Sequence, residues 1–477
     1  MLRKCHNIDM IDKNEVVAQV EPASGIVFQA NVQVLIIGAG ACGLTAALAA
    51  SDNTNDILVL ERDPEPSGST ALSSGFVPAA DTKCQRSKGI QDSAHEFNND
   101  ILAKASGKQN SELSKLVSYK CGKVLDWLGE CHGIDWKILD NFLYPGHTFH
   151  RMHTVSEKTG IGLMNRLQAA IGRAGIAIST NSLVDTIYMS NEIISGVRVK
   201  RPNGLFEFIG CDNLILACNG YGANKELVKK YIPEMSDALY FGHAGNQGHA
   251  VLWGEQIKAG VMHMSGYQGH GSVATPHGVL ITWALMMEGG IQVNEQGLRF
   301  SNENQGYSEQ SVHVLAQSNN VAWVIYDEKL HLLGKEFPDY LKAIKSGAIK
   351  SADNASSLIE LIGVDRKGFE ETLRLIEDFS LSKKVDPFGR EFKRNLAPDE
   401  KMYAIKVTGA LFHTQGGLLV NEKAQVLKSD KTPFKNLFAG GGAACGVSGP
   451  DVSGYLSGNG LLTAFSLGAL AGWNASK

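Results

Sequence analysis

One short segment near the N-terminus constrains the fold more than any other part of the sequence. It opens with the continuously apolar run 34–37, which is typical of a buried parallel strand. The motif GAGACG at 38–43 follows at once and leads into the strong helix formers of 44–50. A second apolar run at 57–60 ends in Glu61. Strand, glycine-rich turn, helix, strand and acidic residue together predict a βαβ unit that binds a dinucleotide.

The glycines of this unit have separate physical tasks. Gly38 permits the tight turn, Gly40 lets the backbone approach a pyrophosphate, and Gly43 lets the helix pack on the strand. The helix N-terminus stabilises the phosphates, and Glu61 accepts the ribose hydroxyls. The alternative is a glycine-rich turn without a ligand, and the strand, helix and acidic residue around the motif argue against it.

Composition excludes several classes of protein. The chain has 477 residues, of which 43% are hydrophobic and 20% charged, which excludes a disordered or collagenous chain and suggests two or three domains. Its 45 Lys and Arg against 49 Asp and Glu give a net charge of −4, which does not support a nucleic-acid partner. The eight cysteines form no CxxC pair, so neither a disulfide framework nor a structural zinc site is expected.

Targeting signals are not evident in the sequence. The first thirty residues lack the apolar core of a secretory signal. The apolar run 34–50 is about 17 residues long, shorter than the ~20 that span a bilayer, so no transmembrane segment is expected. Together with the scattered thiols, this predicts a cytoplasmic protein.

The order of patterns along the chain predicts an interrupted domain. Residues from about 240 to 390 are richer in histidine, methionine and glutamine, and a sheet pattern resumes at 402–407. We therefore predict an N-terminal extension (1–30), a first part of the nucleotide-binding domain (31–240), an inserted second domain (241–390) and a second part of the nucleotide-binding domain (391–477).

Ten segments stand out, in one order, over about residues 32–472. They are GAGACG with Glu61, GSTALSSG (68–75), LDWL (125–128), GHTFHRMHT (146–154), NLILACNGYGAN (213–224), QGHG (268–271), VNEQGLRFSNE (293–303), FHTQGG (412–417), FAGGG (438–442) and YLSGNG (455–460). In this set and order the chain resembles the fumarate reductase/succinate dehydrogenase flavoprotein family. The resemblance implies an α/β fold, with a Rossmann-like FAD-binding domain of the GR2 type and an inserted α+β capping domain. No histidine lies between Arg62 and Ala94, where membrane-bound members link FAD covalently, so non-covalent FAD is expected.

The same resemblance assigns the cofactor contacts. The positive end of the helix that begins near Gly460 would stabilise the N1–C2=O region of reduced flavin. The residues assigned to FAD are Gly38, Ala39, Gly40, Ala41, Cys42, Gly43, Glu61, Arg62, Ser69, Thr70, Ser73, Ser74, Gly75, Val184, Ala217, Gly220, Gly440, Gly441, Asn459, Gly460, Leu461 and Leu462.

The substrate region departs from the dicarboxylate enzymes of that family. Where they carry a glutamate and an arginine of the proton-delivery path, this chain has Trp283 and Met286. Tyr307 stands at the position of the catalytic arginine, and Tyr455 at that of a carboxylate-binding arginine. Because a tyrosine supplies one neutral hydrogen bond in place of a bidentate guanidinium, the pocket suits an uncharged, apolar substrate better than fumarate. Further substrate contacts that the resemblance retains are His270, His413 and Thr282.

The positions of these two tyrosines resemble those of tyrosines in the 3-ketosteroid dehydrogenase branch of the family. There a tyrosine after an N-E-x-x-x-Y pattern, here 302–307, acts on the proton α to a ketone. A second, here Tyr455, holds the ketone oxygen with a backbone group, for which Gly458 is the candidate, and Tyr144 matches a further tyrosine. This implies α,β-dehydrogenation of a cyclic or steroid-like ketone: the hydride passes to flavin N5, the α-proton to Tyr307, and the electrons to an external acceptor.

Several alternatives stay open. The chain could be an ene-reductase of the fumarate reductase type, acting on an unsaturated carboxylate or an enone with an external electron donor, or an electron carrier with no substrate of its own. The tyrosines could be packing residues, and Trp283, Met286 and Met287 could form core.

The histidines of the segment GHTFHRMHT raise the question of a metal. His147, His150 and His153 do not converge on one helix face and lack carboxylates nearby in sequence, so no metal is expected. Arg151 and His153 are expected to orient the flavin or to cap the pocket.

Overall fold

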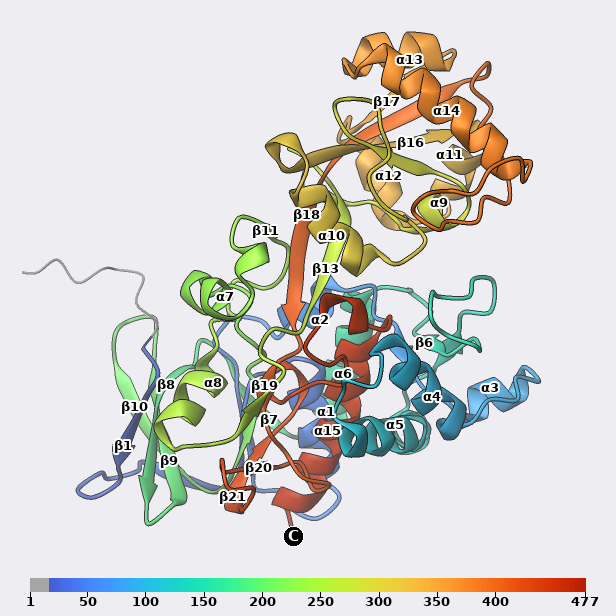
Figure 1. Cartoon of the computed structure of the whole chain (residues 1–477). Helices are drawn as coiled ribbons and strands as arrows, with labels where there is room; N and C mark the ends of the chain where they lie inside the picture. The colour runs from blue at the N-terminus through green and yellow to red at the C-terminus, as the bar shows by residue number, and fades with distance from the viewer. Residues whose placement is uncertain (1–16) are drawn as a thin grey trace, which may run out of the picture.

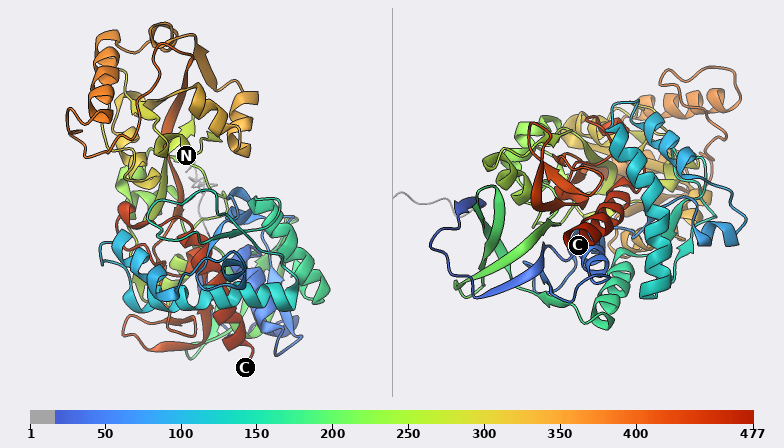
Figure 2. Two further views of the ribbon diagram at one scale, coloured as in Figure 1. Left: turned by 90° about the vertical axis from the view of Figure 1, so that its right-hand side faces the viewer. Right: turned by 90° about the horizontal axis from the view of Figure 1, so that it is seen from below.

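A computed structural model describes residues 17–477, so the first sixteen residues of the predicted N-terminal extension lie outside the described part. The described chain forms two lobes, a larger body and a smaller cap made of residues 267–414 (Figure 1). The long strand β18 (Met402–Thr414) runs from the cap down to the body, and the left view of Figure 2 shows the same separation of the two lobes.

The body is built on a mixed sheet whose central strands are parallel. β2 pairs in parallel with β10 on one side and with β3 on the other, and α1 follows β2 through the turn at 38–40. This confirms the predicted βαβ unit. In order, the strands are β1 (Gln19–Pro22), β8 (Leu183–Ser190), β9 (Ile193–Lys200), β10 (Phe206–Leu216), β2 (Ala30–Ile37), β3 (Ile57–Leu60) and β7 (Ala177–Ser179), with β21 (Pro433–Ala439) beside β10 and β20 (Gln425–Leu427) beside β21.

Two helices pack against each other beside this sheet. α1 (Ala41–Ala50) is buried along its whole length, and so is most of α15 (Asn459–Ala475), as expected for helices that are apolar on all faces. The other helices of the body are α2 (Gly68–Leu72), α3 (Lys83–Ser87), α4 (Ala94–Lys104), α5 (Ser111–His132), α6 (Gly160–Arg173), α7 (Lys225–Tyr231) and α8 (His249–Gln256). Small sheets are formed by β4 (Val77–Pro78), β6 (Met152–Thr154) and β5 (Lys137–Ile138), and by β12 (Val261–Met262) and β19 (Gly417–Leu418).

The cap has its own sheet and its own hydrophobic core. β18 is its central strand, and the others are β13 (Tyr267–Ala274), β14 (Val279–Leu280), β15 (Ile291–Val293), β16 (Val321–Asp327) and β17 (Ile349–Ala352), with β11 (Leu239–Tyr240) added from the body. Its helices are α9 (Ala284–Met287), α10 (Tyr307–Leu315), α11 (Glu328–Gly334), α12 (Pro338–Lys345), α13 (Ala355–Ile362) and α14 (Arg366–Ser380). The α/β fold with an inserted α+β domain is thus confirmed.

The structure differs from the predicted domain limits at two places. The strand that begins at 402 belongs to the cap sheet, because β18 pairs with β13, β16 and β17. At the other end, β1 lies within the predicted extension but pairs in parallel with β8 at the edge of the body sheet. Among residues 17–477, no helix has the length and apolar character needed to cross a bilayer.

Candidate active site

A cavity of about 810 Å³ lies where the cap meets the body. Its walls come from the turn after β2, from α2 and from the start of α15 in the body, and from β13, α9 and the start of α10 in the cap. A cavity of this size between two lobes can enclose a large cofactor together with a small substrate.

The turn after β2 forms one end of this cavity. Gly38 has φ +105°, and a Cβ there would lie 2.5 Å from the carbonyl oxygen of Ala217, so glycine is required. The buried carboxylate of Glu61 accepts hydrogen bonds from the backbone N–H groups of Ala39 at 2.8 Å and Asp63 at 3.0 Å. Glu61 therefore fixes the turn, and it lines the cavity.

Two helices direct their N-termini toward the cavity. α1 follows Gly40 and α15 follows Gly458, and neither helix is capped by the side chain before it or has an acidic residue in its first turn. The first N–H of α1, that of Ala41, donates to Thr70 Oγ1 at 3.1 Å. By contrast, α4, α5 and α6 each begin with a polar N-cap side chain that accepts a backbone hydrogen bond. The backbone amides and the positive dipole at a helix N-terminus bind phosphate and other anionic groups. These two helix starts fit the pyrophosphate and the flavin ring of FAD.

Ser69 joins the segment 68–75 to two asparagines that sequence reasoning missed. Its hydroxyl oxygen accepts hydrogen bonds from Asn219 Nδ2 at 3.1 Å and Asn246 Nδ2 at 2.9 Å. All three residues line the cavity, and Asn219 has φ +66°. A left-handed asparagine before a glycine marks a tight turn after a strand, which is the signal that could have found Asn219.

The structure brings most residues assigned to FAD into one cavity. Those that line it are Gly38, Gly40, Ala41, Cys42, Glu61, Arg62, Ser69, Thr70, Ser73, Ser74, Gly75, Val184, Ala217, Gly441, Gly460 and Leu461. The others lie behind its surface and are Ala39, Gly43, Gly220, Gly440, Asn459 and Leu462. Gly43 and Gly440 serve packing instead: a Cβ on Gly43 would meet the Gly38 carbonyl, and one on Gly440 would lie 2.7 Å from Cys42 Sγ.

The other end of the cavity is a cluster of aromatic residues. Tyr307, the first residue of α10, stacks on His270 of β13, with 4.9 Å between ring centroids. His270 also meets Trp283 edge to face at 5.7 Å and stacks on Phe412 at 5.3 Å. Backbone N–H of Ser272 donates to His270 Nδ1 at 3.2 Å, which leaves the ring proton on Nε2 as a donor. Burial lowers the pKa of His270 to about 3, so the ring is neutral.

Tyr455 faces this cluster from the segment before α15. Its ring lies 6.4 Å from that of Tyr307 and 5.4 Å from that of His413. His413 packs against Gly460, where a Cβ would lie 3.0 Å from its ring, and burial lowers its pKa to about 4. Gly458, the residue before α15, has φ +87° and also lines the cavity. Tyr307 and Tyr455, the two tyrosines predicted to be catalytic, therefore lie close together beside the N-terminus of α15.

The cluster tyrosines keep their protons. Burial raises the pKa of Tyr307 above its ordinary value near 10, although the hydrogen bond with Ser457 acts the other way. Burial and the nearby Tyr307 raise the pKa of Tyr455 well above that value, and hydrogen bonds from the backbone of Gly460 and Gly458 oppose the rise. Burial likewise raises the pKa of Tyr144, which lines the cavity among Phe76 and Phe142. All three phenols are therefore hydrogen donors at neutral pH.

Ser457 belongs to this site and was missed by the sequence analysis. Its Oγ lies 3.1 Å from Tyr307 Oη, and it lines the cavity between Tyr455 and Gly458. The segment YLSGNG contains Ser457 but does not indicate its contact with Tyr307, because the two positions are 150 residues apart in sequence.

Other predicted residues lie elsewhere. Met286 is 1% exposed, belongs to the cap core and does not line the cavity. Met287 packs against the same core. Trp283 belongs to the cap core and also lines the cavity. Arg151 and His153 also lie away from the cavity. Among residues 17–477, no group of three His, Cys, Asp or Glu side chains is placed to hold a metal ion.

Cationic groups are sparse along the cavity wall. Among the described residues, the lysines and arginine that line it are Arg62, Lys158 and Lys342. Arg62 follows Glu61 at the dinucleotide end, Lys158 precedes α6, and Lys342 forms an ion pair with Asp339 at 2.8 Å. The rings that contact the tyrosine cluster are uncharged. Glu309 of α10, which is ion-paired with Lys104, is close enough to add to the raised pKa of Tyr307.

Comparison with known proteins gives a consistent result. The model of the FAD binding domain family matches residues 33–461. The NADH:fumarate oxidoreductase of Klebsiella pneumoniae (strain 342) is 29% identical over 93% of this chain, which spans 47% of that relative's length.

Solved structures with a similar fold include a fumarate reductase and a ketosteroid dehydrogenase. The open conformation of a flavocytochrome c3 fumarate reductase has a TM-score of 0.81 and 26% identity, over 94% of this chain and 78% of that one. The 3-ketosteroid-Δ4-(5α)-dehydrogenase of Rhodococcus jostii RHA1, in complex with 4-androstene-3,17-dione, has a TM-score of 0.77 and 21% identity, over 97% of this chain and the whole of that one. The second likeness concerns the fold alone.

Proposed function

Because the chain belongs to the FAD binding domain family and is an FAD-dependent oxidoreductase related to the fumarate reductases, we propose that it reduces the C=C bond of an uncharged α,β-unsaturated ketone. The observation that carries this proposal is the Tyr307–Tyr455 pair, whose ring contacts are with uncharged side chains. Bound FAD would be non-covalent, since no histidine lies in the segment 63–93.

Two features support an uncharged substrate. The contacts of Tyr307 and Tyr455 are aromatic rings, imidazoles and a serine, with no guanidinium or ammonium group among them. Both histidines of the cluster are neutral because burial lowers their pKa values. Burying a carboxylate beside such groups costs on the order of several kcal/mol of desolvation free energy, as for other unpaired buried charges. No cation in the cluster offsets that cost.

The carbonyl oxygen of the substrate would be held by Tyr455. Its pKa lies well above the ordinary value, with the backbone of Gly458 and Gly460 opposing the rise, so the phenol keeps its proton for an acceptor in the cavity. The adjacent N-terminus of α15 favours negative charge at the same place. This is the arrangement that stabilises an enolate as it forms.

Proton transfer would fall to Tyr307. Reduction of the C=C bond adds one hydride at Cβ and one proton at Cα, and FAD supplies the hydride when it is bound in the reduced form. Tyr307 is protonated, is buried next to Tyr455, and is hydrogen-bonded to Ser457. The proton that Tyr307 gives to Cα would be replaced from solvent, with the Ser457 hydroxyl as a relay. The protonated form that burial favours is the starting state for reduction, whereas ketone dehydrogenation would start from the phenolate of the same residue.

A reductase of unsaturated carboxylates is the second candidate. It is favoured by the Klebsiella relative, whose name gives fumarate as its substrate. A carboxylate would have to be held by His270, His413 and the hydroxyl groups of the cluster alone.

The experiment that separates these reactions is anaerobic. Oxidised holoprotein is mixed with a saturated 3-oxosteroid, and dithionite-reduced holoprotein with a 3-oxo-4-ene steroid, 2-cyclohexenone or fumarate, while the visible flavin absorbance is followed. We expect the enones to restore the oxidised spectrum. Bleaching by the saturated ketone, without reoxidation by an enone, would assign dehydrogenation instead, and reoxidation by fumarate alone would assign a fumarate-type reductase.

A further inference from the structure

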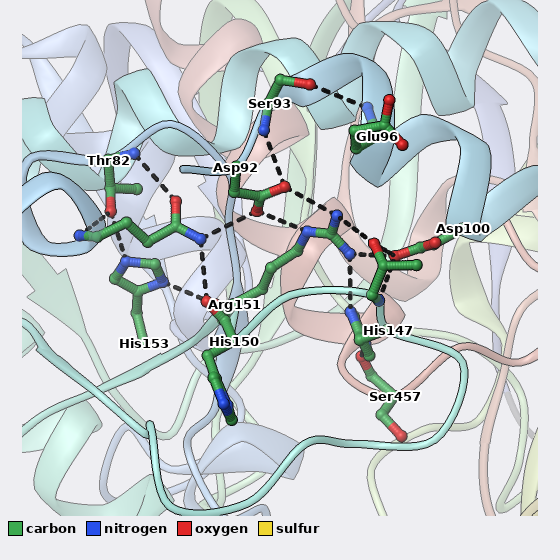
Figure 3. A network of polar contacts seen from close by, with 12 residues as sticks. Thr82, Asp92, Ser93, Glu96, Asp100, His147, His150, Arg151, His153 and Ser457 are labelled. Atoms are coloured by element: carbon green, nitrogen blue, oxygen red, sulfur yellow. Dashed lines mark hydrogen bonds and ion pairs between the residues drawn. The ribbon is translucent and has the colours of Figure 1, made fainter. Parts of the chain in front are cut away.

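A fully buried guanidinium lies behind the tyrosine cluster. Arg151 is 1% exposed, and its fork binds Asp92 through Nε at 2.7 Å and Nη2 at 2.9 Å (Figure 3). Its Nη1 donates to Asp100, which also accepts from the backbone N–H and the hydroxyl of Thr148 at 2.8 and 3.0 Å. Replacing a buried ion pair with well-packed apolar residues is often neutral or stabilising, so stability alone does not explain this arrangement.

The guanidinium fixes the proton of a neighbouring histidine. Arg151 Nη1 lies 3.5 Å from His147 Nδ1. An arginine can only donate, so Nδ1 is the acceptor and the proton of the neutral ring sits on Nε2. Burial, and then the charge of Arg151, lower the pKa of His147 to about 4, which keeps the ring neutral. His147 therefore presents one defined donor, and it points toward Ser457 (Figure 3).

The Nε2–H of His147 donates to the segment before α15, which carries Tyr455 and Ser457. His147 Nε2 lies 3.0 Å from the carbonyl oxygen of Ser457, while Ser457 Oγ lies 3.1 Å from Tyr307 Oη. The loop of His147 also packs on this segment, since a Cβ on Gly146 would lie 2.8 Å from Leu456 Cδ1. Ser457 is thus held from behind through its backbone and faces Tyr307 with its side chain.

We propose that His147 is a positioning residue, fixed by Arg151, whose Nε2–H sets the hydrogen bond between Ser457 and Tyr307. The effect of this positioning on catalysis rests on the proposed function. The hydrogen-bond geometry itself can be tested without any measurement of activity. His147 and Arg151 do not line the cavity, so they act through Ser457 and touch neither substrate nor cofactor.

A matched pair of variants separates this role from mere support of the fold. In His147→Gln the side-chain amide reaches the place of Nε2 and can still donate to Ser457, whereas in His147→Asn it is one methylene too short. Because a misplacement of about 1 Å can cost on the order of 100-fold in rate, we expect the Asn variant to lose at least ~10-fold in kcat for 2-cyclohexenone, with KM within ~2-fold. The Gln variant should stay within ~3-fold of the wild type in both.

The readout that does not depend on turnover is a crystal structure of each FAD-bound variant. We expect the Tyr307 Oη–Ser457 Oγ contact to be kept in the Gln variant and broken in the Asn variant. His132→Asn, at the end of α5 outside the cavity, is the control for loss of an imidazole. If the Asn variant does not fold, Arg151→Lys, which keeps a cation but loses the planar fork, should give the same loss of kcat with an intact flavin spectrum.

The outcomes are distinct. Equal kcat in the Gln and Asn variants, or an unbroken contact in the Asn crystal structure, would overturn the positioning role. If the wild type fails to reduce any enone, the proposed function fails, and a contact broken only in the Asn variant still supports the positioning role.

Discussion

Replacing Tyr307 with phenylalanine removes one hydroxyl and keeps the ring. The ring contacts with His270 at 4.9 Å, Trp283 at 6.4 Å and Tyr455 at 6.4 Å do not need the oxygen, so the aromatic cluster should persist. The hydroxyl makes one hydrogen bond, with Ser457, and its loss should cost about 1 kcal/mol of unfolding free energy. FAD should bind as before.

The effect on the reaction should be much larger than the effect on stability. A positioned proton donor contributes roughly 100- to 10,000-fold, which corresponds to about 3–5 kcal/mol of barrier. The assay is single-turnover reoxidation of the dithionite-reduced variant by 2-cyclohexenone, with thermal unfolding measured in parallel. Tyr119→Phe, at an exposed site on α5, is the matched control and should leave the rate constant unchanged. A Tyr307→Phe rate within ~3-fold of the wild type would remove Tyr307 from the mechanism.

Three further predictions concern the two tyrosines and the buried histidines. Tyr455→Phe should lower the reoxidation rate constant by roughly 100-fold with an unaltered flavin spectrum, and unchanged enone kinetics would refute its role at the carbonyl oxygen. Because burial raises the pKa of Tyr307, reoxidation by an enone should be level from about pH 6 to pH 9; a rate that climbs with pH would indicate a phenolate base. The pKa values of His153, His270 and His413 are lowered from 6.5 to between about 3 and 4, so the folded state holds fewer protons there than the unfolded state. Stability should therefore be complete above pH 6.5 and fall toward pH 4, by about 3 kcal/mol for each histidine, and urea unfolding that is equally stable at pH 7 and pH 4.5 would contradict this.

Local patterns predicted the dinucleotide end of the site well. The turn at 38–40, α1 and Glu61 are close in sequence, so strand, turn and helix signals determine their geometry without knowledge of the rest of the chain. Gly38, Gly40, Ala41 and Glu61 all line the same cavity. The family resemblance gave FAD as the cofactor, which the family match confirms.

Long-range contacts account for what the sequence could not predict. The apolar run at 402–407 has the same pattern whether it pairs in the body sheet or in the cap sheet, so β18 was placed in the wrong sheet. An apolar residue beside a cavity and one in a core also look alike, which explains Met286. Ser457 and His147 owe their roles to contacts across 150 and 310 residues, and no local pattern marks such pairs.

The central claim is that the tyrosine cluster accepts an uncharged enone and disfavours a carboxylate. Its most direct test compares 3-penten-2-one with crotonate, which share the CH3–CH=CH–C=O unit and differ in ending as a methyl ketone or a carboxylate. The measurement is the rate constant with which each reoxidises the dithionite-reduced holoprotein at equal concentration. We predict that the ketone is faster by at least ~10-fold, because no guanidinium meets the carboxylate. Crotonate reacting as fast as the ketone, or faster, would contradict the account.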